Sequence, residues 1–156
     1  MMNYAGFDIV FQEIPGEVTL AINITGCPNN CPGCHSPHLQ KNTGEPLDEN
    51  VLRALIEKYG DAVTCVCFMG GDAEPFKVCM FAGFIKSLRE NLKTGWYSGK
   101  THLPDGIIIA NFDYIKLGPY EKHLGGLDKP TTNQRLYRIE NGEMTNCTEK
   151  FRYLYR

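Results

Sequence analysis

The sequence predicts an α/β protein in which a mainly parallel sheet forms an open, partial β/α barrel. Segments with strand character alternate with segments of helical periodicity along most of the chain, as in a parallel sheet with crossover helices. The chain has 156 residues, and a complete eight-unit barrel needs about 250, so any barrel must be open on one side. The hydrophobic content of 42% is enough for the core of a single domain, residues 1–156.

Strand and helix signals follow one another in the first half of the chain. Residues 18–24 alternate apolar and polar side chains, the period of a strand, and lead at Gly26 into an irregular loop. A helix is expected from Asp48, which can cap it, to Gly60, because the apolar side chains between them lie on one face. Residues 63–69 are nearly all apolar and predict a buried strand that ends in a Gly-Gly-Asp turn.

The second half of the chain continues the alternation. A helix is expected from Pro75 to Leu92, because proline suits a first helical turn and apolar residues recur at helical spacing up to Leu92. The segment 99–112 gives no clear signal. Further strands are expected at residues 96–98, 114–117, 136–139 and 143–145, the last two joined by Asn141-Gly142, a hairpin turn sequence.

Composition excludes several classes of protein. Sixteen Lys+Arg and eighteen Asp+Glu give a net charge of -2, which argues against a strongly basic nucleic-acid binder. The first residues lack the basic flank and apolar core of a secretory signal, and the longest aliphatic run, 107–110, is far too short to span a membrane. We therefore expect a cytoplasmic protein with neither nucleic acid nor a membrane as partner.

The cysteines are the unusual feature of the composition. There are seven, an odd number, in a chain without an export signal, so metal or redox chemistry is favoured over a disulfide framework. Cys27, Cys31 and Cys34 fall within eight residues, on the loop that follows strand 18–24. In α/β folds, ligands bind at the carboxyl ends of the strands, where this loop begins.

Several kinds of site are compatible with this cysteine loop. A structural zinc ion needs a fourth ligand, for which His35 or His38 is available. Covalent haem attachment and a thioredoxin-type dithiol would both use Cys31 and Cys34, and both leave Cys27 without a role. A four-iron cluster held by three cysteines uses all of them and leaves one iron free to bind a substrate. The remaining alternative is three cysteines without any ligand.

The segment from Gly26 to His35, GCPNNCPGCH, resembles the cluster loop of the radical S-adenosylmethionine (SAM) enzymes. Its Cys-Pro-Gly-Cys ending is similar to the branch of activating proteins of anaerobic (class III) ribonucleoside-triphosphate reductase. The resemblance continues, in the same order, through Gly70-Gly71-Asp72, Tyr97-Ser98-Gly99 and residues 131–135.

Two residues depart from the patterns of these enzymes. Gly33 stands before the third cysteine, where many radical SAM enzymes have an aromatic residue, although glycine is found there in the reductase-activating branch. His35 stands after that cysteine, where this branch often has an aromatic residue.

The resemblance implies a reaction as well as a fold, the partial barrel of the radical SAM type. Cys27, Cys31 and Cys34 would hold a [4Fe-4S] cluster whose fourth iron binds the amino and carboxylate groups of S-adenosylmethionine. An electron from a low-potential donor, such as a flavodoxin, would cleave this cofactor to methionine and a 5'-deoxyadenosyl radical. The radical would take a hydrogen atom from a glycine of the large reductase subunit, the protein substrate. No catalytic residue beyond the cluster and the cofactor is implied.

The resemblance also implies which residues contact the cofactor, and each has a structural alternative. For Gly70-Gly71-Asp72 the cofactor role is favoured over the alternative of a tight strand-to-helix connection with Asp72 near the helix start, and for Tyr97-Ser98-Gly99 the alternative is a plain edge strand. Asn133-Gln134-Arg135 either binds the ribose or carboxylate of the cofactor or satisfies loop backbone. The predicted cofactor-binding residues are Gly33, Cys34, His35, Gly70, Gly71, Asp72 and Ser98.

Cys65, Cys67, Cys79 and Cys147 lie outside this motif. They are expected to be buried core residues rather than ligands of a second cluster, because free cysteine behaves as a small hydrophobic residue. Two other functions remain open at this point. One is activation of a different glycyl radical enzyme, such as a formate-lyase-type partner, and the other is a zinc-binding interaction module without catalysis.

Overall fold

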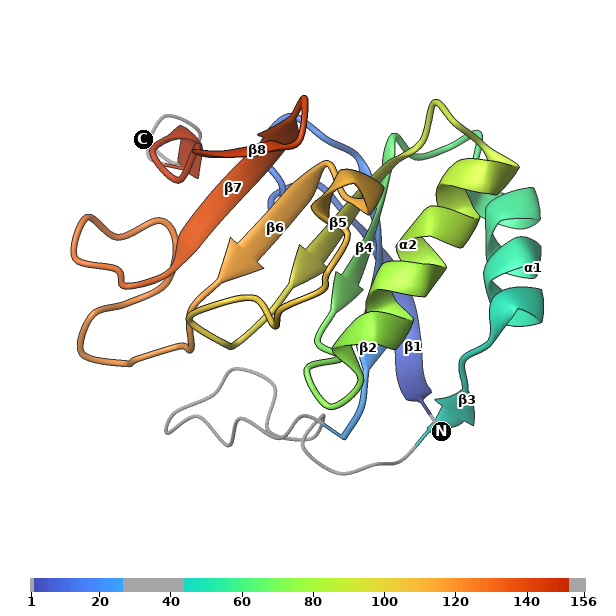
Figure 1. Cartoon of the computed structure of the whole chain (residues 1–156), viewed down its shortest axis with the longest axis horizontal. Coiled ribbons are helices and arrows are strands. Elements are labelled where there is room, and N and C mark those ends of the chain that lie inside the picture. The colour runs from blue at the N-terminus through green and yellow to red at the C-terminus, as the bar shows by residue number, and fades with distance from the viewer. Residues whose placement is uncertain (1, 27–43, 152–156) are drawn as a thin grey trace.

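The computed structural model describes residues 2–26 and 44–151, which form one sheet and two α-helices (Figure 1). The predicted site residues Cys27, Cys31, Gly33, Cys34 and His35 lie outside the described residues. The elements are, in chain order, β1 (Asn3–Val10), β2 (Thr19–Ile24), β3 (Glu45–Pro46), α1 (Glu49–Tyr59), β4 (Cys65–Met69), α2 (Pro75–Leu88), β5 (Lys93–Tyr97), the 3-10 turn η2 (Ile109–Asn111), β6 (Tyr114–Leu117), β7 (Arg135–Glu140) and β8 (Glu143–Asn146).

The sheet has the strand order β3-β1-β2-β4-β5-β6-β7-β8. The central strands β2, β4, β5 and β6 are parallel, whereas the pairings that involve β3, β1, β7 and β8 are antiparallel, so the sheet is mixed. The ends of the parallel strands lie in register, with Asn23 beside Met69 and Met69 beside Tyr97, and we call this end of the sheet the carboxyl edge. The described sheet is open at β3 and β8, and its closure into a partial barrel stays a prediction.

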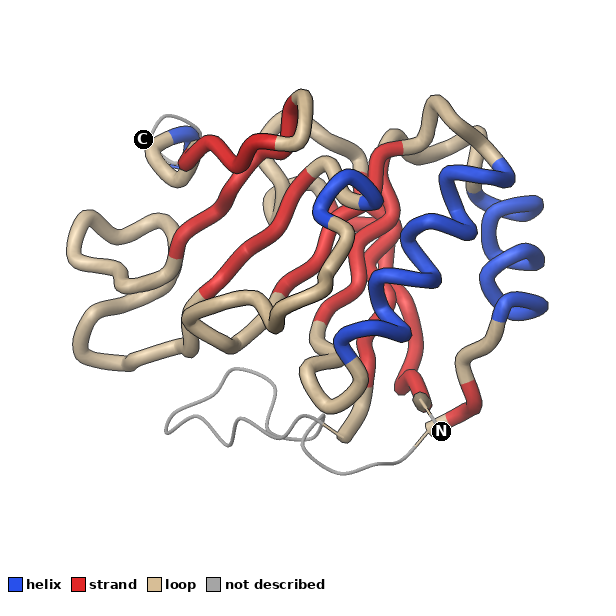
Figure 2. The backbone as a smooth tube through the Cα atoms, in the orientation of Figure 1, coloured by secondary structure: helices blue, strands red, loops and turns tan. Residues whose placement is uncertain are grey.

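Both helices pack on the same face of the sheet, here called the helix face (Figures 1 and 2). The carboxylate of Asp48 accepts a hydrogen bond of 2.9 Å from the Val51 N–H and caps α1, and the Gly60 N–H closes its other end on the Ile56 carbonyl, so the predicted helix is confirmed. Buried side chains of α1, α2 and the strands form the main core, among them Leu52, Ile56, Val78, Phe81, Ile85, Leu20, Ile22, Val66, Phe68, Trp96 and Ile115.

The second face of the sheet carries a smaller core of Ile14, Cys65, Cys67, Tyr114, Leu136, Cys147 and Phe151. Successive residues of a strand point to opposite faces, so Cys65 and Cys67 lie here while Val66 and Phe68 lie on the helix face. Cys79 is buried on the helix face. All four cysteines outside the predicted cluster motif are therefore free, buried core residues, as expected.

Among the described residues, these buried cysteines are not grouped as the ligands of a second metal site would be. Burial raises the pKa of Cys65, Cys67 and Cys147, which disfavours the thiolate that a metal requires. Within residues 2–26 and 44–151, no three His, Cys, Asp or Glu side chains are arranged to hold a metal ion.

Two predicted boundaries are wrong, and two strands, β1 and β3, escape the sequence analysis. Helix α2 ends at Leu88 instead of Leu92, because Arg89 is extended and a turn closed by the Leu92 N–H on the Arg89 carbonyl returns the chain to the sheet. Leu92 is nevertheless buried in the core. Strand β5 starts at Lys93, before the predicted residue 96, and β1 was not predicted.

The predicted hairpin at the end of the chain is confirmed. Asn141 and Gly142 have φ angles of 53° and 77°, the left-handed conformation that a tight two-residue turn between β7 and β8 requires. Between β5 and β6, where the sequence gives no clear signal, the structure has η2.

Within the described ranges, neither helix is long and apolar enough to cross a lipid bilayer.

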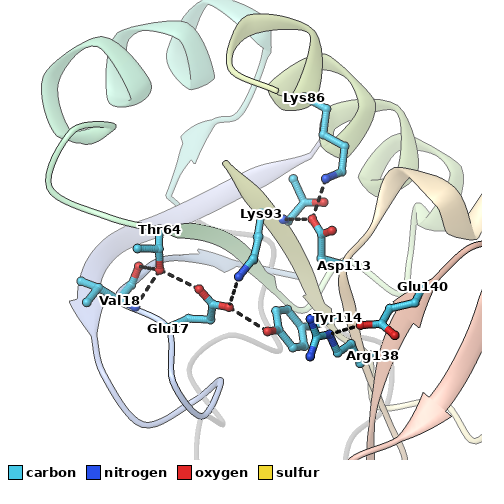
Figure 3. Close-up of polar contacts among 10 residues, drawn as sticks. Glu17, Val18, Thr64, Lys86, Lys93, Asp113, Tyr114, Arg138 and Glu140 are labelled. Atoms are coloured by element: carbon cyan, nitrogen blue, oxygen red, sulfur yellow. Dashed lines mark hydrogen bonds and ion pairs between the residues drawn. The ribbon is translucent and has the colours of Figure 1, made fainter. Parts of the chain in front are cut away.

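A buried carboxylate, that of Glu17, lies at the end of the sheet opposite the carboxyl edge (Figure 3). Glu17, which lies just before β2, accepts hydrogen bonds from Lys93 Nζ at 2.8 Å, Tyr114 Oη at 2.7 Å and Thr64 Oγ1 at 2.8 Å. Burial alone would raise the pKa of Glu17, but these hydrogen bonds outweigh it and lower that pKa. Burial and the hydrogen bond to Glu17 raise the pKa of Tyr114. The three hydrogen bonds satisfy the buried carboxylate of Glu17.

Candidate functional site

The loops that follow β2 and β4 meet at the carboxyl edge. Strand β2 ends at Ile24, and Gly26 leads directly into the predicted cysteine loop. Gly70 follows β4 with a φ of 105°, and a Cβ on it would lie 3.3 Å from the Ile24 carbonyl oxygen. This positive φ and close approach favour glycine. The Gly-Gly-Asp motif therefore lies against the segment that enters the cysteine loop.

Gly71 is also restricted to glycine. Its φ is 100°, and a Cβ would lie 2.5 Å from Val78 Cγ2 on α2. Its carbonyl accepts a 3.0 Å hydrogen bond from the Glu74 N–H, which turns the chain into α2. The two glycines thus bring backbone, rather than side chains, to this part of the edge.

The carboxylate of Asp72 joins the loop after β4 to the loop after β5. Its Oδ1 accepts a hydrogen bond of 2.6 Å from Ser98 Oγ, and its Oδ2 accepts one of 2.8 Å from the Gly99 N–H. Asp72 lies two residues before Glu74, which occupies the cap position of α2 without a side-chain cap bond, so the motif also forms the tight strand-to-helix connection of the structural alternative. Asp72 is partly exposed at the carboxyl edge, where Ser98 and Gly99 fix the orientation of its carboxyl group.

Ser98 is almost completely buried, with an exposed fraction of 1%. Its hydroxyl donates to Asp72 and accepts a 3.1 Å hydrogen bond from the Lys100 N–H. The hydroxyl proton is therefore directed at Asp72, and Ser98 holds this carboxylate in place. The predicted Gly70, Gly71, Asp72 and Ser98 are brought together at one edge of the sheet, and their contact with a cofactor stays a prediction.

The sequence analysis missed two residues that hold this group together. Gly99 donates its backbone N–H to Asp72, and Trp96 donates its indole Nε1–H to the Gly70 carbonyl at 2.8 Å. The sequence did offer a signal for Trp96, because the single tryptophan of the chain lies in a predicted strand beside the Tyr97-Ser98-Gly99 motif. Its partner, a backbone carbonyl 26 residues away, cannot be deduced from spacing.

The segment Asn133-Gln134-Arg135 supports the neighbouring loop after β6. Asn133 Nδ2 donates to the Pro119 carbonyl at 2.9 Å, and Gln134 Nε2 approaches the Gly118 carbonyl at 3.5 Å. The Arg135 guanidinium donates to the carbonyl oxygens of Thr132 and Gln134. These contacts match the alternative in which the segment satisfies loop backbone.

A small cavity lies where the cysteine loop leaves the sheet. Its volume is about 130 Å³, and it is lined by Met2, Ile24, Thr25, Gly26, Gly71, Ala73 and Glu74. The lining joins the end of β2 to the loop between β4 and α2. Gly71 borders this cavity, and the next residue, Asp72, has its carboxylate held by Ser98 and Gly99.

Comparison with known proteins identifies the cysteine motif. The family model described as "4Fe-4S single cluster domain" matches residues 15–114, more than half of the chain and including Cys27, Cys31 and Cys34. Searches of curated proteins and of solved structures found no match. Of the possible occupants of the cysteine loop, this match favours a four-iron cluster, to which three thiolates are suitable ligands. The chain therefore belongs to the 4Fe-4S single cluster domain family and is an iron–sulfur protein.

Proposed function

We propose that this protein is a radical SAM activase that generates a glycyl radical on the large subunit of anaerobic ribonucleoside-triphosphate reductase. The observation that carries the proposal is the contact between Gly70 and the end of β2. It places a glycine-rich, carboxylate-bearing loop beside the start of the cysteine loop, as a cofactor that touches both loops requires.

The three cysteines of the motif are the proposed cluster ligands. Cys27, Cys31 and Cys34 supply one thiolate each, so a four-iron cluster keeps one iron without a protein ligand. When bound, the cluster supplies the electron that breaks a carbon–sulfur bond of S-adenosylmethionine. Gly33 and His35, on either side of Cys34, are proposed to contact the same cofactor.

The loop after β4 is proposed to bind the methionine end of the cofactor. Gly70 and Gly71 supply the positive φ angles that turn the chain at the carboxyl edge, and their backbone is proposed to contact the ligand. The carboxylate of Asp72 is the proposed acceptor for the ammonium group, and its two hydrogen bonds to Ser98 and Gly99 fix its orientation before the ligand arrives. Because the carboxylate is already oriented, less conformational entropy is lost when the ligand binds.

The protein substrate must bring a glycine residue to the carboxyl edge. The described sheet is open at both margins, which is compatible with a macromolecular substrate. The electron must come from outside the chain, and a low-potential donor such as a flavodoxin is proposed. Oxygen would destroy a cluster with an exposed iron, so the proposed activity requires anaerobic conditions.

The test is anaerobic reconstitution with iron and sulfide, followed by electron paramagnetic resonance of the reduced protein with S-adenosylmethionine and candidate partners. We expect about four irons per chain for a single cluster, brown colour, 5'-deoxyadenosine as product and a glycyl doublet with the reductase subunit. A doublet only with a formate-lyase-type enzyme would change the partner but keep the activase. A colourless protein with one zinc ion per chain and no cofactor cleavage would refute the proposal.

A further inference from the structure

Trp96 is bound to the Gly-Gly-Asp loop from inside the core. Its side chain is 1% exposed, and its indole Nε1–H donates a 2.8 Å hydrogen bond to the Gly70 carbonyl. The ring is stacked on Phe112, with centroids 5.7 Å apart. The Gly70 N–H donates to the Tyr97 carbonyl at 3.0 Å, so both backbone polar groups of Gly70 are held by β5.

The two hydrogen bonds to β5 fix the Gly70 backbone and therefore the direction of the Gly71 N–H. The described residues contain no cis peptide bond, and in a planar trans peptide the carbonyl of one residue and the N–H of the next point in opposite directions. Trp96 lies on the helix face and takes the Gly70 carbonyl, so the Gly71 N–H is directed away from the indole.

The Gly71 N–H is itself unusual. Gly71 is buried, and its N–H makes no hydrogen bond with any residue of 2–26 or 44–151. Buried backbone donors without a partner are rare, because each has lost its hydrogen bonds to water. The next residue is Asp72, whose carboxylate is fixed by Ser98 and Gly99. An unused donor and a fixed acceptor thus stand side by side in the chain.

We propose that Trp96 is a positioning residue that aims the Gly71 N–H at a carboxylate oxygen of the bound ligand. An α-amino acid carries its ammonium and carboxylate on the same carbon atom, so the adjacent residues Gly71 and Asp72 can contact both groups. Asp72 accepts from the ammonium, and the Gly71 N–H donates to the carboxylate. The proposal rests on the proposed function, in which the ligand is S-adenosylmethionine, and adds to it a donor and the side chain that orients it.

The test removes the indole N–H and leaves the shape of the side chain. The chain has one tryptophan, so 3-benzothienylalanine at position 96, with sulfur in place of the N–H, changes no other indole. Trp96→Phe serves as a second variant. Anaerobic calorimetry of the reconstituted protein measures the Kd for S-adenosylmethionine, with iron content and the thermal midpoint as checks. We expect the Kd and KM to rise roughly three- to tenfold, the loss of one hydrogen bond, with iron content and kcat little changed.

Phe112→Leu is the matched control, because it removes the stacking partner of Trp96 and leaves the indole N–H. We expect it to lower the thermal midpoint without changing the Kd. Wild-type affinity in the benzothienyl variant would overturn the positioning role, and so would an equal rise in Kd in Phe112→Leu. Absence of S-adenosylmethionine binding by the wild-type cluster protein would instead refute the proposed function, and the positioning role with it.

Discussion

Ser98 Oγ lies 2.6 Å from Asp72 Oδ1, and this hydrogen bond joins the loops that follow two adjacent parallel strands. The second carboxylate oxygen is held by a backbone N–H of the same β5 loop. Because both contacts come from the two residues directly after β5, the carboxylate is held at the edge of the sheet before any ligand binds.

Ser98→Ala tests the importance of this orientation. The variant leaves one oxygen of Asp72 without its partner, and we expect S-adenosylmethionine to bind about tenfold more weakly, since hydrogen bonds to charged groups are among the stronger ones. Iron content should not change, because no cluster ligand is affected. The measurement is anaerobic calorimetry. Ser87→Ala, which removes an exposed hydroxyl on α2, should bind as the wild type does. Equal affinity in Ser98→Ala would contradict a role for the contact.

Gly71→Ala and Gly16→Ala separate backbone strain from steric conflict. Both residues have positive φ angles, but only Gly71 faces a close neighbour, Val78 Cγ2 at 2.5 Å from the added Cβ. We expect Gly16→Ala to reduce the free energy of unfolding by about 1 kcal/mol and Gly71→Ala by about 2–4 kcal/mol. Urea titration measures both. Equal losses would show that Val78 gives way at little cost.

The cysteines are expected to fall into two chemical groups. Cys65, Cys67, Cys79 and Cys147 are buried, and we expect them to resist iodoacetamide in the folded protein at about pH 8 and to react after unfolding in urea. Mass spectrometry of the peptides distinguishes each site.

Cys31→Ala should lose the cluster and cofactor cleavage, whereas Cys147→Ala should retain both. Loss of cleavage in a folded Cys147→Ala protein would indicate a second role for that thiol.

The Glu17 contacts predict a dependence of stability on acid. The folded-state pKa of Glu17 is lowered from its ordinary value of 4.5, so its contribution to stability is present above that value. The contribution is lost as the pH falls through the lowered folded-state pKa. We expect Glu17→Gln to cost roughly 1–3 kcal/mol at neutral pH and to weaken the acid dependence.

Urea titrations between about pH 3 and pH 7 measure this effect. Glu143→Gln changes an exposed carboxylate on β8 and serves as the control, with stability close to that of the wild type. If Glu17→Gln and the wild type lose stability in parallel as the pH falls, Glu17 is not the group responsible.

Local signals in the sequence predict local structure well in this chain. The cap of α1 at Asp48, the apolar run of β4 and the Asn141-Gly142 turn each depend on neighbouring residues, and each is found where expected. The end of α2 was misplaced because Leu92 keeps the helical spacing although it is buried after a turn. Strand β1 has no clean alternation, and its pairing with β2 contains a register shift.

The candidate site was predicted in its parts but not in its connections. The cysteine spacing and the Gly-Gly-Asp motif could be recognised because they are contiguous. The contacts that fix the Gly-Gly-Asp motif join residues far apart, since Ser98 and Asp72, and likewise Trp96 and Gly70, are separated by 26 positions. Such pairs are set by the register of the sheet, which a single sequence does not reveal.

The tight turn between β7 and β8 has a practical use. Strand β7 begins at the carboxyl edge, beside Leu117, so its far end and the turn at Gly142 lie at the opposite edge of the sheet. The positive φ of Gly142 disfavours a side chain on that residue, but the neighbouring Glu143 is exposed. A spin label or short epitope grafted there would therefore report on association with a partner, or capture the protein on a surface, without obstructing the end of the molecule where chemistry is proposed.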